Sequence, residues 1–221
     1  MMYQESGHGD NMSVDKIVCV GKNYLDHALE FGEVVPENPV LFLKPFSVLK
    51  QAQSWGEQIT LAFPDGDPAV QPECEIVLRV AHDGFRMTEK EAKSAISAVT
   101  LGLDMTLRTQ QTQLKKCGHP WTTSKVFMDA AVLGPWIPYH SFENYMDVTF
   151  QFEIDGKRCQ SAKGQDMMMH PEQLLVYISQ HFPLKAHDII FTGTPAGVMN
   201  VTRQTTAVLS WDHYSYQVKW V

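Results

Sequence analysis

The chain has 221 residues, of which 44% are apolar, and its formal net charge is −7 at pH 7. That length suits one large domain, and the apolar content is ample for a hydrophobic core. The acidic balance argues against nucleic acid or a membrane surface as the main partner, and no apolar run approaches the roughly 20 residues that a membrane-spanning helix needs.

The first residues are polar and lack the apolar stretch of a secretory signal. We therefore expect residues 1–15 to form a loose leader and residues 16–221 to form one folded domain. Four cysteines lie far apart without any Cys-x-x-Cys pairing, at Cys19, Cys74, Cys117 and Cys159. Such a pattern is typical of reduced thiols in a cytoplasmic protein.

Apolar runs and alternating segments predict strands along most of the chain. In chain order they cover residues 16–20, 40–43, 75–80, 101–104, 148–154, 188–192 and 214–221. The segments 148–154 and 214–221 alternate between apolar and polar residues, as does a strand with one buried face. The pair Asp155-Gly156 follows the first of these two segments and predicts a tight hairpin turn.

Helices are expected to be fewer and short. They are predicted over residues 23–31, 88–99, 106–117 and 171–181. Thr88-x-x-Glu91 is a capping box at the start of the second helix. Gly32 and Gly118 stand just past the first and third helices, where glycine commonly ends a helix. Because strands dominate and helices are scattered, the pattern favours an α+β fold with a substantial β core over a doubly wound sheet.

Three carboxylates form the first candidate site. Glu73 and Glu75 stand two positions apart, so on a strand both would point to the same face. Two such charges repel each other, and one must take up a proton unless a cation joins them. Mg²⁺ prefers oxygen ligands of this kind, and Asp104 supplies a third carboxylate after the next apolar run. The set indicates either a divalent metal site or solvated acidic residues at strand ends.

Sequence motifs of several other enzyme classes are missing. There is no Gly-x-Gly-x-x-Gly, no phosphate-binding loop, no His-Glu-x-x-His and no Gly-x-Ser-x-Gly. Nucleotide enzymes, zinc proteases and serine hydrolases of the common kinds therefore lose support.

His27 and Glu30 form a second candidate site within the predicted helix 23–31. Residues three apart on a helix are neighbours. A carboxylate beside an imidazole orients the ring and raises its basicity, as a general base requires. A surface His–Glu pair has the same spacing, so the spacing by itself leaves both interpretations open.

Two lysines and a turn are candidates for substrate contacts. Lys44 ends an apolar strand and Lys125 lies at a polar-to-apolar boundary. Lysines in such places usually extend to water, but three carboxylates with Mg²⁺ keep a charge of about −1, and a site of that charge needs lysines to accept an acid. Thr194, in a glycine-rich turn after a predicted strand, offers a hydroxyl and an N–H to a ligand, although an ordinary tight turn has the same residues.

Taken together, these segments resemble the fumarylacetoacetate hydrolase family, in its small acylpyruvase-like branch. The resemblance runs from about Lys16 to about Val201 and rests on motifs that follow one another in a fixed order. They are Val18-Cys-Val-Gly-Lys-Asn-Tyr with His27 and Glu30, Pro39-Val-Leu-Phe-Leu-Lys-Pro, Glu73-x-Glu75, Leu103-Asp-Met-Thr with Arg108 and Gln111, Pro120-Trp with Lys125, Gln160 with Met167, and Thr192-Gly-Thr-Pro-Ala-Gly-Val.

The resemblance implies a mixed β-sheet roll with flanking short helices, a single catalytic domain and a homodimer. It also implies Mg²⁺ or Mn²⁺ as cofactor, held by Glu73, Glu75 and Asp104. The family's water-activating pair matches His27 and Glu30, on a segment that acts as a lid. Its substrate-anchoring lysine matches Lys125. Further substrate-binding positions of the family are matched by Lys22, Lys44, Arg108, Gln111 and Thr194.

The sequence departs from the family pattern in several places. Lys22 stands where the family often has arginine, so carboxylate recognition there is expected to differ. Thr109 replaces a frequent aspartate, and His187 stands where a glycine is usual. The chain after Val201 lacks the usual Gly-Asp turn, which leaves the pairing of the last strands open.

The expected reaction is hydrolysis of a C–C bond in acylpyruvates, which are 2,4-dioxo acids, to pyruvate and a carboxylic acid. Decarboxylation or tautomerisation of oxaloacetate is an alternative that passes through the same enolate. Isomerase or hydratase chemistry on 2-hydroxyhepta-2,4-diene-1,7-dioate is another. A catalytically silent protein that binds a keto acid is the alternative from a different class.

Overall fold

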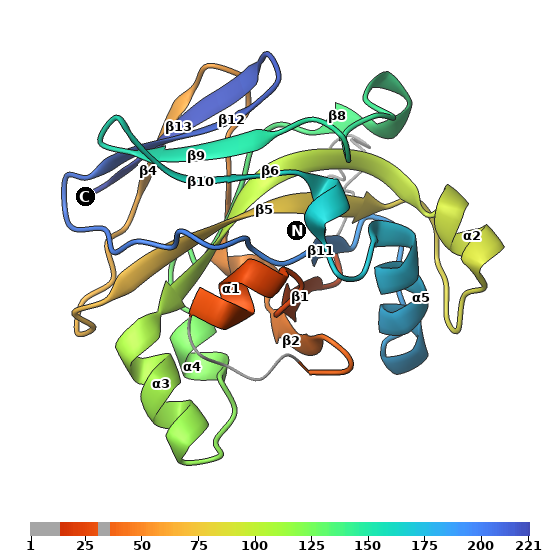
Figure 1. The fold of residues 1–221 in the computed structure, drawn as a ribbon, viewed down its shortest axis with the longest axis horizontal. Coiled ribbons are helices and arrows are strands. Elements are labelled where there is room, and N and C mark those ends of the chain that lie inside the picture. The colour runs from red at the N-terminus through yellow and green to blue at the C-terminus, as the bar shows by residue number, and fades with distance from the viewer. Residues whose placement is uncertain (1–13, 31–35) are drawn as a thin grey trace, which may run out of the picture.

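The computed structural model describes residues 14–30 and 36–221, and in them strands form two sheets with short helices around them (Figure 1). The first sheet contains β1 Ile17–Gly21, β2 Val40–Lys44, β3 Leu49–Gln51, β5 Val70–Val80, β6 Ile96–Leu107, β7 Ala131–Leu133, β8 Ile137–Pro138 and β11 Ile189–Phe191. The second contains β4 Gln58–Leu61, β9 Phe150–Ile154, β10 Lys157–Ala162, β12 Thr206–Trp211 and β13 Tyr214–Trp220. The α-helices are α1 Leu25–Glu30, α2 Glu89–Ser94, α3 Arg108–Lys116, α4 Thr122–Lys125 and α5 Pro171–His181, and 3-10 turns cover Phe46–Val48, Tyr139–Ser141 and Gly164–Asp166.

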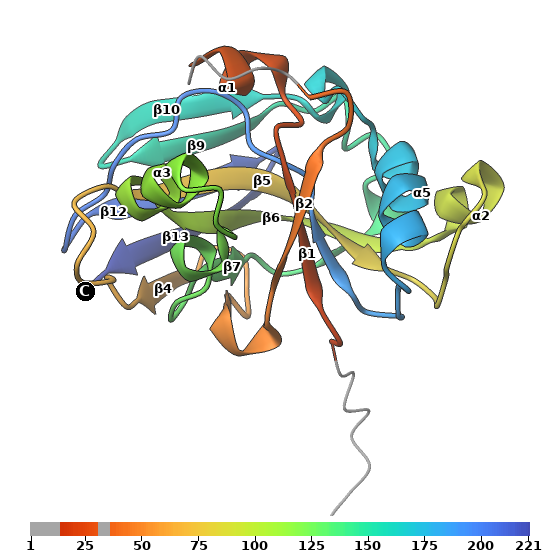
Figure 2. The same cartoon turned by 90° about the horizontal axis from the view of Figure 1, so that it is seen from below.

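The first sheet is mixed and has the long antiparallel pair β5–β6 at its centre. Its order is β2-β1-β11-β5-β6-β7-β3, with β8 also beside β6. The pairs β1–β11 and β3–β7 are parallel. Seen from below, β1 and β2 run side by side across the middle of the molecule, with α3 on one side and α5 with α2 on the other (Figure 2).

The second sheet has the order β10-β9-β12-β13-β4 and contacts the first sheet through β6. The Tyr216 hydroxyl on β13 donates a hydrogen bond to the Leu101 carbonyl on β6, at 3.2 Å. Almost every residue of β5 and β6 is buried, on both faces of the sheet. A strand covered on both faces reads as a continuous apolar run, which is why the carboxylates on these strands stand out.

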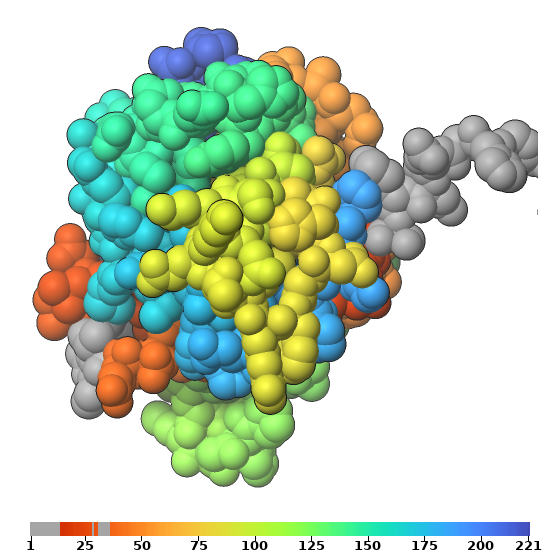
Figure 3. Space-filling model, turned by 90° about the vertical axis from the view of Figure 1, so that its right-hand side faces the viewer, coloured from red at the N-terminus to blue at the C-terminus, as the bar shows by residue number. Residues whose placement is uncertain are grey.

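The helices lie in two groups. Helices α2 and α5 pack against each other on one side of the molecule (Figure 3). Helix α5 begins at Pro171, which is favourable in a first turn, and buries Leu174, Leu175 and Ile178. Helices α3 and α4 contact each other and β6, and α4 also contacts β2. This second group therefore stands beside the β5–β6 pair.

The predicted α+β class with a β core is confirmed, and two helix predictions are wrong at their ends. The helix after Thr88 ends at Ser94, and Ile96 and Val99 belong to β6. Two turns of helical spacing are too short to exclude a strand, and pairing with β5 along its whole length decides the outcome. The third helix begins at Arg108, because Thr106 still pairs with β5.

The turns and the end of the chain settle the other open points. Asp155 and Gly156 both have positive φ, of 47° and 76°, and join β9 to β10 as predicted. Strand β12, which the sequence analysis did not predict, pairs with both β9 and β13. Its buried positions alternate with half-buried ones, so a weak period-2 signal was present in the sequence.

Two sequence predictions fall on residues outside the described ranges. The leader at 1–15 overlaps the description only at its last two residues, and Gly32, expected to end the first helix, lies in the range 31–35. Of the helices in the described part of the chain, none has both the length and the apolar character to cross a membrane.

Candidate active site

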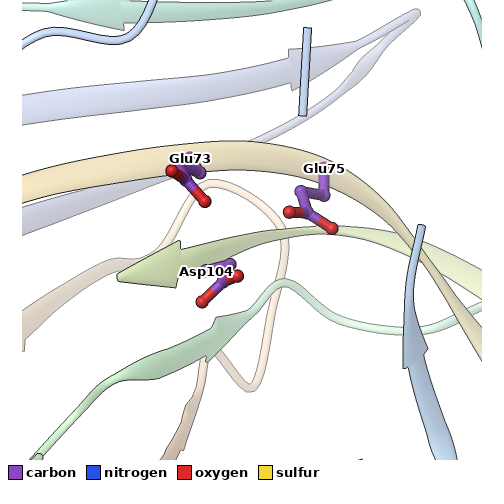
Figure 4. A group of neighbouring side chains, drawn as sticks. All are labelled: Glu73, Glu75 and Asp104. Atoms are coloured by element: carbon purple, nitrogen blue, oxygen red, sulfur yellow. The ribbon is translucent and has the colours of Figure 1, made fainter. Parts of the chain in front are cut away.

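Glu73, Glu75 and Asp104 come together from the paired strands β5 and β6. In the ladder, Glu73 lies opposite Asp104 and Glu75 lies opposite Gly102. Since alternate residues on a strand share a face, all three carboxylates project to the same side of the sheet (Figure 4). One oxygen from each carboxylate lies within 4.8 Å of the others, and all three residues are buried.

Gly102 makes room for this cluster. A Cβ atom at this position would lie 2.6 Å from the Val132 carbonyl oxygen and 2.8 Å from the Val77 Cγ2 atom. Both neighbours belong to the packed sheet, so neither can move aside cheaply. Gly102 therefore lets β6 pack closely against β5 and β7 at the position opposite Glu75.

Two buried lysines contact the acidic cluster. The Lys125 Nζ atom lies 2.9 Å from Glu73 Oε2 and 2.7 Å from Asp104 Oδ2. The Lys44 Nζ atom lies 2.6 Å from Asp104 Oδ1 and donates to the Ala130 carbonyl at 2.5 Å. These lysines supply the positive charge that the sequence analysis expected an acidic metal site to need.

Glu73 is also paired with Arg108 of α3. Burial opposes its ionisation, but the charges of Lys125 and Arg108 outweigh burial and hold the pKa of Glu73 well below its usual range. Burial likewise opposes the charge on Lys125, and the carboxylates of Asp104 and Glu73 raise the pKa of Lys125 above its usual value. Both groups are therefore charged throughout the physiological pH range.

Glu75 behaves in the opposite way. Burial raises its pKa well above the usual value, and the negative charges of Asp104 and Glu73 add to that rise. The Gly193 N–H donates to Glu75 Oε2 at 2.7 Å, but one hydrogen bond does not compensate for the loss of water. Unless a further cation is present, these surroundings favour the protonated form of Glu75.

This donor set fits a hard divalent cation. It consists of three carboxylates, each able to offer one oxygen within a space of a few ångströms, with no thiol or imidazole among them. Mg²⁺ and Mn²⁺ favour oxygen ligands of this kind over softer donors. A cation at this point would also allow Glu75 to ionise, because it offsets the like charges that now raise the pKa.

His27 lines the same pocket from α1, and Glu30 stands beside it on the same helix. The His27 Nδ1 atom lies 3.4 Å from Glu30 Oε2. Burial lowers the pKa of His27 below its usual 6.5, although the charge of Glu73 opposes this shift. The imidazole is therefore neutral near pH 7. Glu30 accepts a hydrogen bond from the Gly197 N–H at 3.2 Å, which ties α1 to the glycine-rich turn after β11.

Asn23 fixes the start of this α1 segment. Its amide nitrogen donates to the carbonyls of Thr192 and Met169, and its amide oxygen accepts from the Met169 N–H. The Asn23 side chain is almost fully buried. It joins the turn before α1 both to the strand end that precedes Gly193 and to the segment before α5.

Thr194 lines the pocket and is linked to the second sheet through Gln160. The Thr194 hydroxyl donates to the Cys74 carbonyl, between the two glutamates of β5, at 2.9 Å. Gln160, on β10, donates to Thr194 Oγ1 and accepts from the Cys74 N–H. The second sheet thus holds the Thr194 turn against the carboxylate strand.

One pocket unites most of the predicted residues. Its lining is Val20, Gly21, Lys22, His27, Phe42, Glu73, Glu75, Asp104, Arg108, Gln111, Lys115, Trp121, Lys125 and Thr194. Of the residues proposed from sequence, Glu30 and Lys44 do not line this pocket. Glu30 contacts the lining residue His27, and Lys44 contacts the lining residue Asp104.

Comparison with known proteins agrees with this geometry. The sequence model described as "Fumarylacetoacetate (FAA) hydrolase C-terminal" matches residues 16–216. The chain belongs to the fumarylacetoacetate hydrolase family. The resemblance inferred from the sequence is confirmed, and so is the expectation of a fold of this family's type.

Two relatives of the chain are named as oxaloacetate tautomerases. Oxaloacetate tautomerase YcgM of Escherichia coli (strain K12) is 34% identical over 203 residues, which are 91% of this chain and 90% of that protein. The mitochondrial oxaloacetate tautomerase fahd-1 of Caenorhabditis elegans is 36% identical over 186 residues, covering 84% of this chain and 85% of the relative. These names show that the chain belongs to a family of enzymes, and they do not settle its reaction.

A solved structure adds a metal to this picture. The fumarylpyruvate hydrolase of Pseudomonas aeruginosa, in complex with Mn²⁺ and pyruvate, superposes with a TM-score of 0.85 at 29% identity, covering 97% of this chain and 94% of that one. The 5-carboxymethyl-2-hydroxymuconate delta-isomerase of Mycobacterium smegmatis superposes with a TM-score of 0.78 at 28% identity, covering 94% and 79%. Together with the buried acidic triad, the likeness to the Mn²⁺-bound hydrolase indicates a divalent metal site.

The departures from the family pattern have structural explanations. His187 has a φ of 74°, in the left-handed region that glycine adopts without strain, so the usual glycine is replaced at some conformational cost. Lys22 also has positive φ, of 64°, and lines the pocket. Thr109 brings no negative charge to the first turn of α3, but Asp67 lies next to this turn and supplies one. The Asp67 carboxylate accepts a hydrogen bond from the Gln110 N–H at 2.8 Å.

Three lining residues with aromatic or charged side chains received no role in the sequence analysis. They are Phe42, Lys115 and Trp121. Lys115 follows Arg108 and Gln111 at positions i+7 and i+4 of α3, a spacing that places all three on one helix face. That spacing was visible in the sequence, but a lysine in a last helical turn is also expected for stabilising the helix end.

Proposed function

We propose that this protein is a metal-dependent enzyme that hydrolyses the C3–C4 bond of acylpyruvates. The observation that supports this most strongly is the shared pocket. A neutral imidazole, paired with a carboxylate, faces three buried carboxylates that fit a divalent cation. A base beside a metal site of this kind is suited to reactions that pass through the enolate of a 2-oxo acid.

In this proposal Glu73, Glu75 and Asp104 hold Mg²⁺ or Mn²⁺. The cation, when bound, polarises the 2-oxo acid end of the substrate and offsets the negative charge of the enolate. Lys125 contributes a further positive charge from the protein, since its ammonium group remains charged and lies within hydrogen-bonding distance of two of the carboxylates.

His27 acts as the general base. Its neutral ring takes a proton from the attacking water, while Glu30 orients the imidazole and stabilises the cation that forms. The new C–O bond forms at C4, and the C4 oxygen becomes an oxyanion. Lys125 or Gln111 donates to that oxyanion. The C3–C4 bond then breaks, its electrons form the pyruvate enolate, and protonation at C3 gives pyruvate and a carboxylic acid.

The other predicted residues bind the substrate. Arg108 and Gln111 share a hydrogen bond of 2.6 Å and lie on the pocket side of α3, where they can meet a carboxylate. Lys22 and Thr194 line the same pocket from the turns after β1 and β11. Lys44 acts indirectly, because it contacts Asp104 and two backbone carbonyls.

Keto–enol tautomerisation of oxaloacetate is the second candidate function. The specific support for it is the name shared by several relatives of more than 30% identity that cover most of the chain. The same base can move a proton between C3 and the enol oxygen, without an attacking water. Decarboxylation of oxaloacetate, isomerase or hydratase chemistry, and a silent keto-acid-binding protein remain weaker alternatives. The homodimer and the cytoplasmic location expected from the sequence also remain predictions.

One experiment separates these functions. Purified protein with Mg²⁺ or Mn²⁺ is supplied with acetylpyruvate, fumarylpyruvate or the enol form of oxaloacetate, and loss of each compound is followed together with pyruvate formation. Release of pyruvate from the two acylpyruvates supports hydrolysis, whereas enol loss without pyruvate supports the tautomerase. Turnover that is unchanged by exhaustive chelation contradicts the metal site.

Substitution of the base tests its role. His27→Ala is expected to lower kcat by roughly 10²–10⁴-fold, the usual contribution of general base catalysis. His213→Ala is a matched control, since His213 is exposed on the turn between β12 and β13. Unchanged acylpyruvate hydrolysis by His27→Ala would remove His27 from the mechanism.

A further inference from the structure

The pocket continues beyond the residues that the proposed mechanism uses. Its described lining includes Lys115, from the last turn of α3, and Trp121, just before α4. Neither residue is assigned to the carboxylate cluster or to the base. Lys115 is half-buried, whereas its neighbour Lys116 is exposed.

An aromatic wall connects this part of the pocket to its floor. The Lys125 Nζ atom lies 4.9 Å from the centre of the Phe42 ring, and the Phe42 and Trp121 ring centres are 6.0 Å apart. The Lys115 Nζ atom lies 4.8 Å from the centre of the Trp121 ring. Two ammonium groups therefore stand at opposite ends of a wall made of two rings, one beside the carboxylates and one nearer to solvent.

Helix geometry explains why Lys115 belongs to the pocket and Lys116 does not. Arg108, Gln111 and Lys115 recur at helical spacing on one face of α3, and all three line the pocket. Lys116 is turned by about 100° from this row and lines a different groove, with Asp65 and Asp67. The two lysines thus have the same chemistry and nearly the same position in the chain, but different surroundings.

The charges of the lining indicate what kind of substrate this arrangement accepts. Three acidic and four basic side chains line the pocket. With a dication on the carboxylates, the lining carries a clear positive excess, which the single carboxylate of a simple 2-oxo acid does not balance. A second carboxylate at the far end of the substrate would bring the charges closer to balance, and the ring wall suits a flat or extended carbon chain between the two ends.

We propose that Lys115, held against Trp121, binds the second carboxylate of a dicarboxylic 2-oxo acid whose far end lies several carbons from the 2-oxo group. This inference rests on the proposed function, because the near end of the substrate must occupy the metal site. Lys115 is then a specificity residue. It selects elongated dicarboxylic substrates over acylpyruvates that end in an uncharged group.

Calorimetric binding of two unreactive ligands tests this inference apart from catalysis. 2-Oxohexanedioate and 2-oxohexanoate have the same chain length and differ in the terminal carboxylate, and neither has the 4-oxo group that hydrolysis needs. In Mg²⁺ buffer we expect the wild-type protein to bind the diacid about tenfold more tightly, as for one gained charge-assisted hydrogen bond. Lys115→Met should remove this preference, Lys115→Arg should keep it, and Lys116→Met should leave it unchanged.

Turnover provides a second measurement. With fumarylpyruvate, Lys115→Met should raise KM and leave kcat nearly unchanged, while its KM for acetylpyruvate should not move. The inference is overturned if the wild-type protein binds both six-carbon ligands equally, if Lys115→Met keeps the preference, or if Lys116→Met loses as much as Lys115→Met. If the wild-type protein binds neither ligand, the proposed function itself fails, and this inference fails with it.

Discussion

At the scale of single residues, the contrast between Glu73 and Glu75 decides how the site behaves. Both carboxylates are buried on the same face of β5, two positions apart. Lys125 and Arg108 keep Glu73 ionised, whereas Glu75 has the Gly193 N–H and two negative neighbours. Burying a third negative charge is costly. A proton on Glu75 lowers this cost, and a metal ion bound to the cluster can take over the role of the proton.

Glu75→Gln should separate stability from metal binding. A glutamine resembles the protonated glutamate and can still accept from the Gly193 N–H, so the metal-free variant should be at least as stable as wild type. Because the folded-state pKa of Glu75 is raised, its contribution to stability is complete below the usual pKa of 4.5 and is lost as the pH rises. The advantage of the variant should thus grow with pH.

Thermal unfolding with and without Mn²⁺ checks this prediction. Mn²⁺ should raise the Tm of wild type through preferential binding to the folded state, and should have little effect on Glu75→Gln. Two outcomes would contradict the proposal that Glu75 is protonated without metal and binds the metal once ionised. One is a variant that is clearly less stable than wild type without metal, and the other is a variant that keeps the full Mn²⁺ stabilisation.

Metal affinity should depend on pH for the same reason. Since the cation binds the ionised form, Glu75 must release its proton, so the affinity for Mn²⁺ should increase as the pH rises toward the raised pKa of Glu75. Calorimetry at neutral pH in buffers of different ionisation enthalpy measures the protons released. Affinity that stays constant above about pH 6, where an ordinary glutamate is already ionised, would show that Glu75 is not a proton-binding ligand.

At the scale of elements, the α1 segment depends on contacts outside the helix. Helix α1 has only six residues, too few to be stable alone. It is held by Asn23 at its start and by Glu30, which accepts from the Gly197 N–H, at its end. The position of His27 in the pocket therefore depends on these two contacts more than on helix propensity.

Asn23→Ala tests the first contact. The substitution removes three buried hydrogen bonds and leaves the Met169 N–H without its acceptor, so we expect it to lower the free energy of unfolding by about 2–4 kcal/mol. Urea denaturation measures the change. Asn200→Ala is the control, because Asn200 is exposed and its side chain bonds Gln71 at the surface, and its effect should stay within about 0.5 kcal/mol. Equal effects of the two substitutions would contradict the anchoring role.

At the scale of the whole molecule, both sheets contribute to holding the site in place. The carboxylates belong to the first sheet, whereas Gln160 belongs to β10 of the second. Gln160 bonds the Cys74 N–H, the Thr194 hydroxyl and the Pro195 carbonyl at once. One buried amide therefore fixes the second sheet, the carboxylate strand and the glycine-rich turn relative to one another.

Gln160→Leu should weaken this junction. The leucine has a similar size but leaves the Cys74 N–H and the Pro195 carbonyl unpaired in the interior, so the free energy of unfolding should fall by about 2–4 kcal/mol. Gln217→Leu provides a control in the same sheet, since Gln217 is exposed on β13. Metal affinity should also fall for Gln160→Leu and not for Gln217→Leu. If Gln160→Leu left both metal affinity and stability unchanged, Gln160 would not be needed to hold the site.

The sequence alone was sufficient for the family and the α+β class, and it pointed to most of the residues that line the pocket. Spacings that a strand or a helix converts into a shared face suggested Glu73 with Glu75 and His27 with Glu30, and the ordered family motifs supplied most of the others. It also located α5 and the turn at Asp155, because proline fixes φ at a helix start and glycine readily adopts the positive φ of a tight turn.

Only the tertiary structure decided the remaining points. Ile96 belongs to β6 because β5 is available to pair with it, and no local signal carries that information. Glu73 and Glu75 have nearly identical sequence contexts, yet the pKa of Glu73 is lowered and the pKa of Glu75 is raised. Their difference comes from the distances to Lys125, Arg108 and Asp104, which lie far along the chain, and Coulomb interactions depend on distance in space and not on separation in sequence.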